Sequence, residues 1–282
     1  MVKILAHAKL NLHLRIIGTL PDGYHALETV MQTISLSDQL CITPNQTGRI
    51  SFTCNDSALN GPENLVIKAS NLFLRATGLS DGFDIYLTKQ IPVAAGLGGG
   101  SSDAAAALTA LNHYYHMPIT TSALEEIGLQ LGADVPFFIR GGCSLAENKG
   151  EILTPLKKTK KYAYVIVKHG EKPSTGAMYA ALDAVGYTTN AQPLDFCRLA
   201  NDAAYLRAYA ANDFVSVSPF DRQLQTDFLA CGAERIYLSG SGPTCFAVFD
   251  NSAAAGAVFE KMRKKYPLCF LADDTESGSL LV

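Results

Sequence analysis

Hydrophobic and polar residues alternate along the first stretch of the chain. Leucine or isoleucine occupies every second position from Leu10 to Ile16, and Lys9 and Asn11 begin the polar set between them. A period of two is typical of a β-strand, whose side chains point alternately to opposite faces. We therefore predict a half-buried strand over residues 8–16. Lys9 and Asn11 share its polar face, which we expect to be solvated unless Lys9 has a partner.

Similar patterns predict the other elements. Short strands are expected over residues 27–40, 50–54, 83–87, 162–167, 235–238, 245–249 and 268–271. Apolar residues at helical spacing predict helices over residues 62–76, 122–131, 176–184, 195–211, 219–230 and 253–265. Because helices packed on antiparallel sheets form α+β domains, we predict an α+β fold.

A basic segment divides the chain. Residues 141–151 are expected to form a hairpin-like unit, and the lysine-rich residues 157–161 that follow are typical of a solvated connection. A chain of 282 residues can build two cores. We therefore predict two domains, residues 1–156 and residues 157–282.

A glycine-rich loop leads directly into a helix start at Pro92–Ser102. Four glycines at positions 96–100 allow backbone conformations and close approaches that a Cβ would block. Ser101 and Ser102 offer an N-cap for the alanine-rich helix that follows. Helix N-termini bind anions, so we favour a phosphate site over a simple strand-to-helix turn. The glycine spacing fits neither the P-loop nor the dinucleotide pattern, which indicates a different phosphate-binding family.

Three other stretches contain candidate functional groups. Tyr24 and His25 follow a proline-glycine turn and are either a packed loop anchor or a pair that stacks on a flat ring. Asp134 stands among apolar residues and is either a helix-capping or turn aspartate or a buried carboxylate that needs a cationic partner. Ser239–Pro243 is a second glycine-serine loop, which is either a hairpin turn or a phosphate cradle.

Composition and charge narrow the class of protein. The chain is 48% hydrophobic and 17% charged, as expected for a compact globular protein. A net charge of −3 gives no general attraction to nucleic acid or to anionic membranes, so any phosphate ligand must be held by a local site. His113 and His116 have no third ligand nearby in the sequence and are expected to be surface residues.

The cysteines and the N-terminus bear on the compartment. Seven cysteines without any Cys-x-x-Cys pair predict free thiols in a reducing cytosol rather than a disulfide framework or a zinc site. No apolar run reaches membrane-spanning length, and the first residues lack the apolar core of a signal peptide. We expect a cytoplasmic protein, and a monomer, because no exposed apolar stripe is evident.

Three stretches, taken in order, resemble the motifs of the galactokinase, homoserine kinase, mevalonate kinase and phosphomevalonate kinase superfamily. They are Ala8–Asn11, Pro92–Ser102 and Ser239–Pro243. One branch of the superfamily has similar motifs at three further places: the doubled serine after the glycines, Asp22–His25 and Gly132–Pro136. The substrate of that branch is a polyol linked to cytidine diphosphate. The resemblance implies an N-terminal domain like the second domain of ribosomal protein S5, a ferredoxin-like C-terminal domain and an active site in the cleft between them.

The resemblance also implies an activity, the transfer of the γ-phosphoryl group of ATP to a hydroxyl of that polyol. Magnesium is expected with ATP, and its ligands are not assigned. Lys9 and Asp134 are implied as the catalytic pair, with Asp134 as the base, and Asn11, Tyr24 and His25 as substrate-binding residues. The implied ATP-binding residues are Pro92, Val93, Ala94, Ala95, Gly96, Leu97, Gly98, Gly99, Gly100, Ser101, Ser102, Asn64 and Lys89.

One motif departs from the family pattern. The family has Ala-x-Gly-x-Gly-Glu where this chain has Asn148 in place of the first glycine of Ala146–Glu151. Asparagine tolerates positive φ better than other non-glycine residues, so the turn can be kept.

Two other functions stay open from the sequence. One is a kinase of the same superfamily that acts on another small alcohol, such as homoserine or mevalonate. The other is a nucleotide-binding protein without activity, against which the presence of both Lys9 and Asp134 argues.

Overall fold

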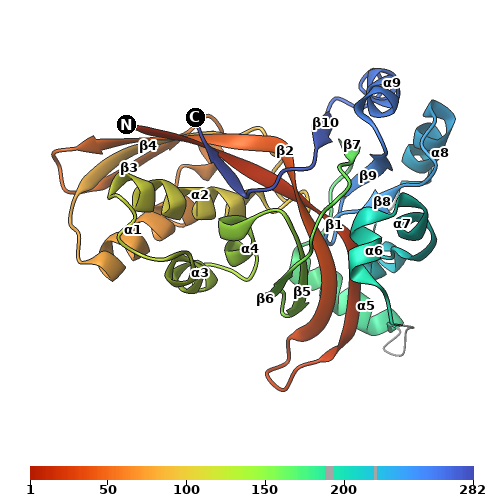
Figure 1. Cartoon of the computed structure of the whole chain (residues 1–282), viewed down its shortest axis with the longest axis horizontal. Coiled ribbons are helices and arrows are strands. Elements are labelled where there is room, and N and C mark those ends of the chain that lie inside the picture. Colours follow the sequence, from red (N-terminus) through yellow and green to blue (C-terminus); the bar gives the residue numbers. More distant parts are fainter. Residues whose placement is uncertain (188–192, 219–220) are drawn as a thin grey trace.

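The computed structural model describes residues 1–187, 193–218 and 221–282, which form two antiparallel-rich sheets with helices. Two long strands, β1 (Val2–Thr19) and β2 (His25–Asn45), pair along their length and extend from the N-terminal sheet toward the C-terminal half (Figure 1). The remaining strands of the N-terminal sheet are β3 (Ile50–Cys54), β4 (Gly82–Thr88), β5 (Cys143–Asn148), β6 (Ile152–Pro155) and β11 (Ser279–Leu281).

Helices cover one face of the N-terminal sheet (Figure 1). In α1, buried residues recur from Val66 to Phe73 at helical spacing, and Asn64 caps its start while Gly78 ends it in the left-handed conformation. The alanines of α2 are almost fully buried, so this helix lies close to the sheet. The helical segments here are η1 (Ser57–Leu59), α1 (Leu65–Thr77), α2 (Gly99–Tyr114), α3 (Thr121–Leu129) and α4 (Val135–Arg140).

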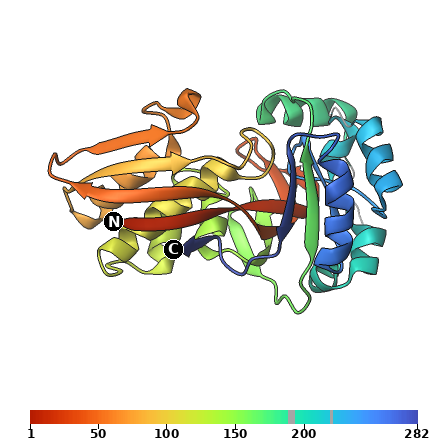
Figure 2. The ribbon, with the colours of Figure 1, turned by 90° about the horizontal axis from the view of Figure 1, so that it is seen from above.

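The C-terminal half builds a four-stranded sheet with helices around it (Figure 2). Its spatial order β10-β7-β9-β8 and its antiparallel pairing give the β-α-β-β-α-β arrangement of a ferredoxin-like fold. Its elements are β7 (Ala163–Lys168), α5 (Thr175–Val185), α6 (Phe196–Asn201), α7 (Ala203–Tyr209), η2 (Asp213–Ser216), α8 (Arg222–Cys231), β8 (Tyr237–Leu238), β9 (Thr244–Phe249), α9 (Ser252–Met262) and β10 (Cys269–Asp273).

Strand β7 separates two cores. Tyr164 and Ile166 face the side that packs against β1, whereas Val165 and Val167 face the helices α5, α8 and α9. The two-domain α+β architecture predicted from the sequence is confirmed. The last strand, β11, returns to the N-terminal sheet and pairs with β1, from Ile4 opposite Leu281 to Ala6 opposite Ser279.

Several predicted strands differ from those observed. The strand predicted at residues 8–16 is longer, and its polar side chains are not solvated: Lys9, Asn11, His13 and Arg15 are all buried. The register of β1 with β2 shifts between Asn11 and His13, which interrupts the predicted alternation. The short strands expected within residues 27–40 form one continuous strand, β2. The last predicted strand, residues 268–271, is β10, and β11 was not predicted.

The helices also show differences. Helix 195–211 is two helices, because Asp202 in extended conformation ends α6 and caps α7. Helix α4 was not predicted from the sequence. The start predicted at Pro219 lies outside the described residues, and α8 begins at Arg222.

The structure also bears on the predictions made for the cysteines, for His113 and His116, and for the lysine-rich segment. All seven cysteines are free thiols, as predicted. His113 and His116 are exposed. The segment 157–161 is exposed as expected except at Lys158, which pairs with the buried carboxylate of Asp274 at 2.7 Å. Among the described residues, no helix is long and apolar enough to cross a membrane.

Candidate active site between the two sheets

Three connected cavities lie where the glycine loop, the long strands and the C-terminal half meet. A central cavity of about 220 Å³ shares Gly96 and Gly98 with a glycine-loop cavity of about 400 Å³. On its other side the central cavity shares Lys149, Thr175 and Tyr179 with an outer cavity of about 610 Å³. A molecule in the central cavity can therefore contact occupants of both neighbours.

The glycine-loop cavity brings together every residue predicted to bind ATP except Ser102. Helix α2 begins at its wall, and Gly98, at φ +71°, is the N-cap residue. The predicted serine cap is wrong: Ser102 lies inside the first turn and donates its hydroxyl to His7 O at 2.6 Å, away from the cavity. Ser101, in contrast, lines the cavity. The N–H groups at the start of α2 have no partner within the helix, which is the arrangement that the predicted anion site requires.

A buried ion triad fixes Lys89 in the wall of this cavity. Its Nζ pairs with Asp38 and, at 2.8 Å, with Asp103, and Asp38 also accepts the N–H of Ile91 at 2.9 Å. Burial alone would lower the pKa of Lys89, but the two carboxylates outweigh it and raise this pKa. Burial raises the pKa of Asp103. Neither carboxylate was predicted, because each is far from Lys89 in the sequence and outside any motif.

The second glycine-serine loop, Ser239–Pro243, packs against the glycine loop and holds it in position. It is the turn of the β8–β9 hairpin, and the hydroxyl of Ser239 donates to Gly96 O at 2.9 Å and accepts the N–H of Asn11 at 3.3 Å. The backbones are so close that a Cβ on Gly96 would lie 2.2 Å from Ser239 O. Glycine is therefore required at this position, which has φ +79°. One hydroxyl thus joins the glycine loop, strand β1 and the C-terminal sheet.

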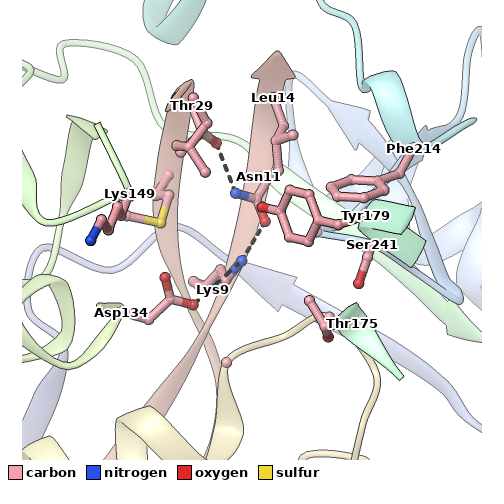
Figure 3. A pocket seen from close by; sticks show the side chains of 16 residues that line it. Lys9, Asn11, Leu14, Thr29, Asp134, Lys149, Thr175, Tyr179, Phe214 and Ser241 are labelled. Carbon is pink, nitrogen blue, oxygen red and sulfur yellow. Dashed lines mark hydrogen bonds and ion pairs between the residues drawn. The ribbon is translucent and has the colours of Figure 1, made fainter. Parts of the chain in front are cut away.

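Lys9, Asn11 and Asp134 all face the central cavity (Figure 3). Lys9 Nζ donates to Asn11 Oδ1, and Asn11 Nδ2 donates to Thr29 Oγ1 at 2.8 Å. Thr29 in turn donates to His13 O at 2.5 Å, which orients its oxygen to accept from Asn11. This chain of hydrogen bonds fixes the amide of Asn11 with its oxygen toward Lys9. Thr29 was not predicted, because its role depends on the pairing of β1 with β2.

Asp134 lies opposite Lys9, with Oδ2 4.0 Å from Lys9 Nζ. It occupies the position before α4, but its side chain makes no capping hydrogen bond, so the capping alternative is excluded. The expectation of a buried carboxylate was wrong, since its side chain is 38% exposed, toward the cavity. Burial lowers the pKa of Lys9, and the carboxylate of Asp134 opposes this shift. The pair thus combines a buried ammonium with an accessible carboxylate.

Tyr24 and His25 border the outer cavity. His25 stacks on Tyr179 of α5, with ring centroids 4.6 Å apart, and its Nε2 lies 2.7 Å from Asp183 Oδ1. Tyr24 is 63% exposed, and Lys149 Nζ lies 4.3 Å from its ring centre. The loop-anchor interpretation therefore describes His25, while Tyr24 presents an open aromatic face. Tyr179 and Asp183 were missed, because helical spacing alone did not show which face of α5 points here.

The hairpin that departs from the family pattern keeps its turn. Asn148 has φ +64°, the left-handed conformation that we predicted asparagine would tolerate. Its side chain bonds to Glu151 Oε1 at 2.5 Å, and Glu151 also accepts the N–H of Lys149 at 2.8 Å. Lys149 pairs with Asp22, and both residues line the outer cavity. The substitution therefore leaves the cavity wall intact.

Family models match both halves of the chain. Residues 64–142 match the GHMP kinases N terminal domain, and residues 195–268 match the GHMP kinases C terminal domain. A crystal structure of a homoserine kinase from Cytophaga hutchinsonii superimposes with a TM-score of 0.74 at 18% identity, over 100% of this chain and 97% of the other, and so shares the fold. Together with the glycine-loop site, these matches define the chain as a GHMP kinase, a class of phosphotransferases.

Proteins with a higher sequence identity to this chain indicate which family within the class it belongs to. A 4-diphosphocytidyl-2-C-methyl-D-erythritol kinase of Geobacter metallireducens is 40% identical over 89% of this chain and 90% of its own, and one of Clostridium perfringens is 37% identical over 94% of each. A crystal structure of 4-(cytidine 5'-diphospho)-2C-methyl-D-erythritol kinase superimposes with a TM-score of 0.83 at 31% identity, over 96% of this chain and 98% of the other. The chain belongs to the 4-diphosphocytidyl-2-C-methyl-D-erythritol kinase family.

Proposed function

We propose that this kinase transfers the γ-phosphoryl group of ATP to the C2 hydroxyl of 4-diphosphocytidyl-2-C-methyl-D-erythritol, a step of the non-mevalonate isoprenoid precursor pathway. The observation that carries this proposal is the position of the Lys9–Asp134 pair. It lies in the central cavity, between the glycine loop and a large cavity with an open aromatic face. The two neighbouring cavities suit the two substrates, and the pair lies where they would meet.

ATP is assigned to the glycine-loop cavity. The first N–H groups of α2 and the glycine backbone would bind its phosphates, as helix N-termini commonly bind anions. Asn64 and Lys89 line the far side, where adenosine would lie. The side-chain oxygen of Asn64 already accepts the N–H of Val66 at 2.9 Å, and Lys89 is paired, so both offer fixed rather than mobile surfaces.

The cytidyl group is assigned to the outer cavity. The exposed ring of Tyr24 offers a face on which cytosine can stack. His25 offers a ring whose orientation is set by Asp183 and Tyr179. A cytosine here would leave the methylerythritol end of the substrate free to enter the central cavity.

Asp134 acts as the general base in this proposal. Its accessible carboxylate takes the proton of the C2 hydroxyl while the hydroxyl oxygen bonds to the γ-phosphorus and the bond from that phosphorus to the bridging oxygen of ADP breaks. Lys9, fixed by Asn11, faces Asp134 and offsets the charge that develops on the transferring group.

Magnesium is part of the proposal as a partner of the nucleotide. In the part of the chain that the structure describes, no three or more His, Cys, Asp or Glu residues gather to hold a metal. Mg²⁺ prefers oxygen ligands and commonly takes one or two from the protein and the rest from phosphates and water. The hydroxyl of Ser101, which lines the glycine-loop cavity, is such a donor and fits this mode of binding. When bound, the ion neutralises phosphate charge.

The proposal is tested by ADP release with purified protein, ATP and Mg²⁺. The cytidyl substrate should support turnover, whereas homoserine and mevalonate should not. In a second measurement, CDP and CMP should raise the melting temperature. Turnover of homoserine or mevalonate without protection by CDP would contradict the assignment of the outer cavity. Absence of turnover with all three alcohols would favour a binding protein without activity.

A further inference from the structure

Lys172 is a lysine at the edge of the central cavity that the proposed mechanism does not use. Its Nζ donates to Ser241 Oγ at 2.8 Å and to Thr175 Oγ1 at 3.2 Å. Both acceptors line the central cavity, and Thr175 also lines the outer cavity. In Figure 3, Thr175 and Ser241 lie across the cavity from Lys149. Two neutral hydroxyls therefore hold an ammonium group where the two cavities join.

Among the residues that the structure describes, this ammonium group has no carboxylate counter-ion. Across the described ranges of the chain, no carboxylate pairs with Lys172, and no group opposes the lowering of its pKa by burial. The other lysines without a carboxylate partner, Lys3, Lys157, Lys261 and Lys264, are exposed, whereas Lys172 is half-buried. A partly desolvated charge is unfavourable unless an opposite charge approaches it. The site is therefore suited to an anionic ligand.

The start of helix α5 adds positive potential at the same place. Ser174 is its N-cap residue, and its hydroxyl accepts the N–H of Ala177 at 3.2 Å. The N–H groups of Thr175 and Gly176, in the first turn, have no partner within the helix. Both residues line the outer cavity. The helix end and Lys172 thus favour the same kind of ligand, a phosphate group.

We propose that Lys172 binds the diphosphate of the cytidyl substrate and so helps to set its position relative to the catalytic pair. This inference rests on the proposed function. If cytosine lies in the outer cavity and the reacting hydroxyl lies beside Asp134, the diphosphate between them must pass Thr175. Lys149, on the other side, is already neutralised by Asp22. The phosphates of ATP belong to the glycine-loop cavity, which Thr175 does not line.

The first test is steady-state kinetics of Lys172→Ala. KM for the cytidyl substrate should rise about tenfold, the scale of one hydrogen bond to a charged group, while kcat and KM for ATP stay within about twofold. Lys172→Arg should restore most of the loss, because it keeps the charge. Lys264→Ala, which removes an exposed lysine, is the matched control for net charge and should behave as the unmodified protein.

The second test is direct binding of CDP and of cytidine to the same variants. Lys172→Ala should weaken CDP by about tenfold and leave cytidine unchanged, because only CDP carries the diphosphate. Equal weakening of both ligands, or a rise in KM for ATP instead, would overturn the proposal. If the unmodified protein turns over the cytidyl substrate and Lys172→Ala does so with the same KM, this inference fails while the proposed function stands. If the unmodified protein does not turn it over, the proposed function itself fails.

Discussion

Replacing Asp134 by asparagine tests the chemistry of the site most directly. Asparagine keeps the shape of the side chain but cannot accept the proton of the hydroxyl. The loss of a general base lowers kcat by about 10²-fold to 10⁴-fold, and 10²-fold corresponds to about 2.7 kcal/mol in the barrier. We therefore expect kcat of Asp134→Asn to fall by at least about 10²-fold, with KM for both substrates nearly unchanged.

The structure indicates that this loss will not come from unfolding. The Lys9–Asp134 pair is 4.0 Å long, and the side chain of Asp134 is 38% exposed. The carboxylate is partly solvated, and Lys9 keeps its hydrogen bond to Asn11 when the carboxylate is removed. The loss of the pair should therefore lower the free energy of unfolding by on the order of 1 kcal/mol, below the effect expected on the barrier. Urea denaturation of Asp134→Asn should therefore give a midpoint close to that of the unmodified protein.

The pH dependence of the variant provides a further check. The carboxylate of Asp134 opposes the lowering of the pKa of Lys9 by burial, so its removal should lower this pKa further. If the reaction needs the charged ammonium, activity is lost as pH rises through that pKa. The alkaline limb of the kcat profile should then lie at lower pH in Asp134→Asn than in the unmodified protein.

A double-mutant cycle completes the test. Lys9→Ala should also lose kcat, and the double variant should lose less than the product of the two single effects, because residues that act as a unit are not additive. The assay is ADP release at saturating ATP and cytidyl substrate. Turnover of Asp134→Asn within a few-fold of the unmodified protein would remove Asp134 as the base and refute this reasoning.

Three further substitutions test the surroundings of the pair. Gly98→Val should raise KM for ATP more than KM for the cytidyl substrate. Gly98 has φ +71°, and a Cβ there would lie 2.6 Å from the ring of Phe138. Unchanged nucleotide affinity would contradict the ATP assignment. His25→Ala should raise KM for the cytidyl substrate and leave KM for ATP nearly alone, and an equal rise in both would favour a purely structural role. Ser239→Ala should lower the free energy of unfolding by about 1–3 kcal/mol, because Asn11 N–H and Gly96 O lose a buried partner. An unchanged urea midpoint would show that the two hydrogen bonds of Ser239 contribute little to stability.

Local patterns predicted the parts of the site that depend on local conformation. The glycine run indicated a loop before a helix, and the tolerance of asparagine for positive φ predicted the turn at Asn148, which has φ +64°. Lys9 and Asn11 were placed correctly on one face of a strand, because the period of two is a property of the backbone. The motifs that indicated the kinase superfamily lie in these same segments.

Tertiary contacts determine the features of the site that the sequence did not predict or predicted wrongly. The face of β1 with Lys9 is buried because the glycine loop and the residues before α4 lie beside it, and nothing in residues 8–16 indicates that contact. Thr29 and Asp38 belong to β2 and reach the site through strand pairing and chain reversal. Ser102 was expected to cap a helix, but Gly98 begins the helix one turn earlier. The errors in burial and in partners concern residues distant in the sequence, whereas the cap was misplaced by one turn within the glycine loop itself.

The pairing of β11 with β1 has consequences for how the protein is made and how it can be re-engineered. β11 lies beside β1 although most of the chain separates them in the sequence, and the N–H of Val282 donates to Lys3 O at 3.1 Å (Figure 1). The N-terminal sheet therefore gains its last strand only after the C-terminal sheet has been translated. A fragment ending at residue 156 would leave the edge of β1 unpaired and prone to association. Because the two ends of the chain are adjacent, a short linker can join them, and a circular permutant opened at an exposed loop should keep both sheets.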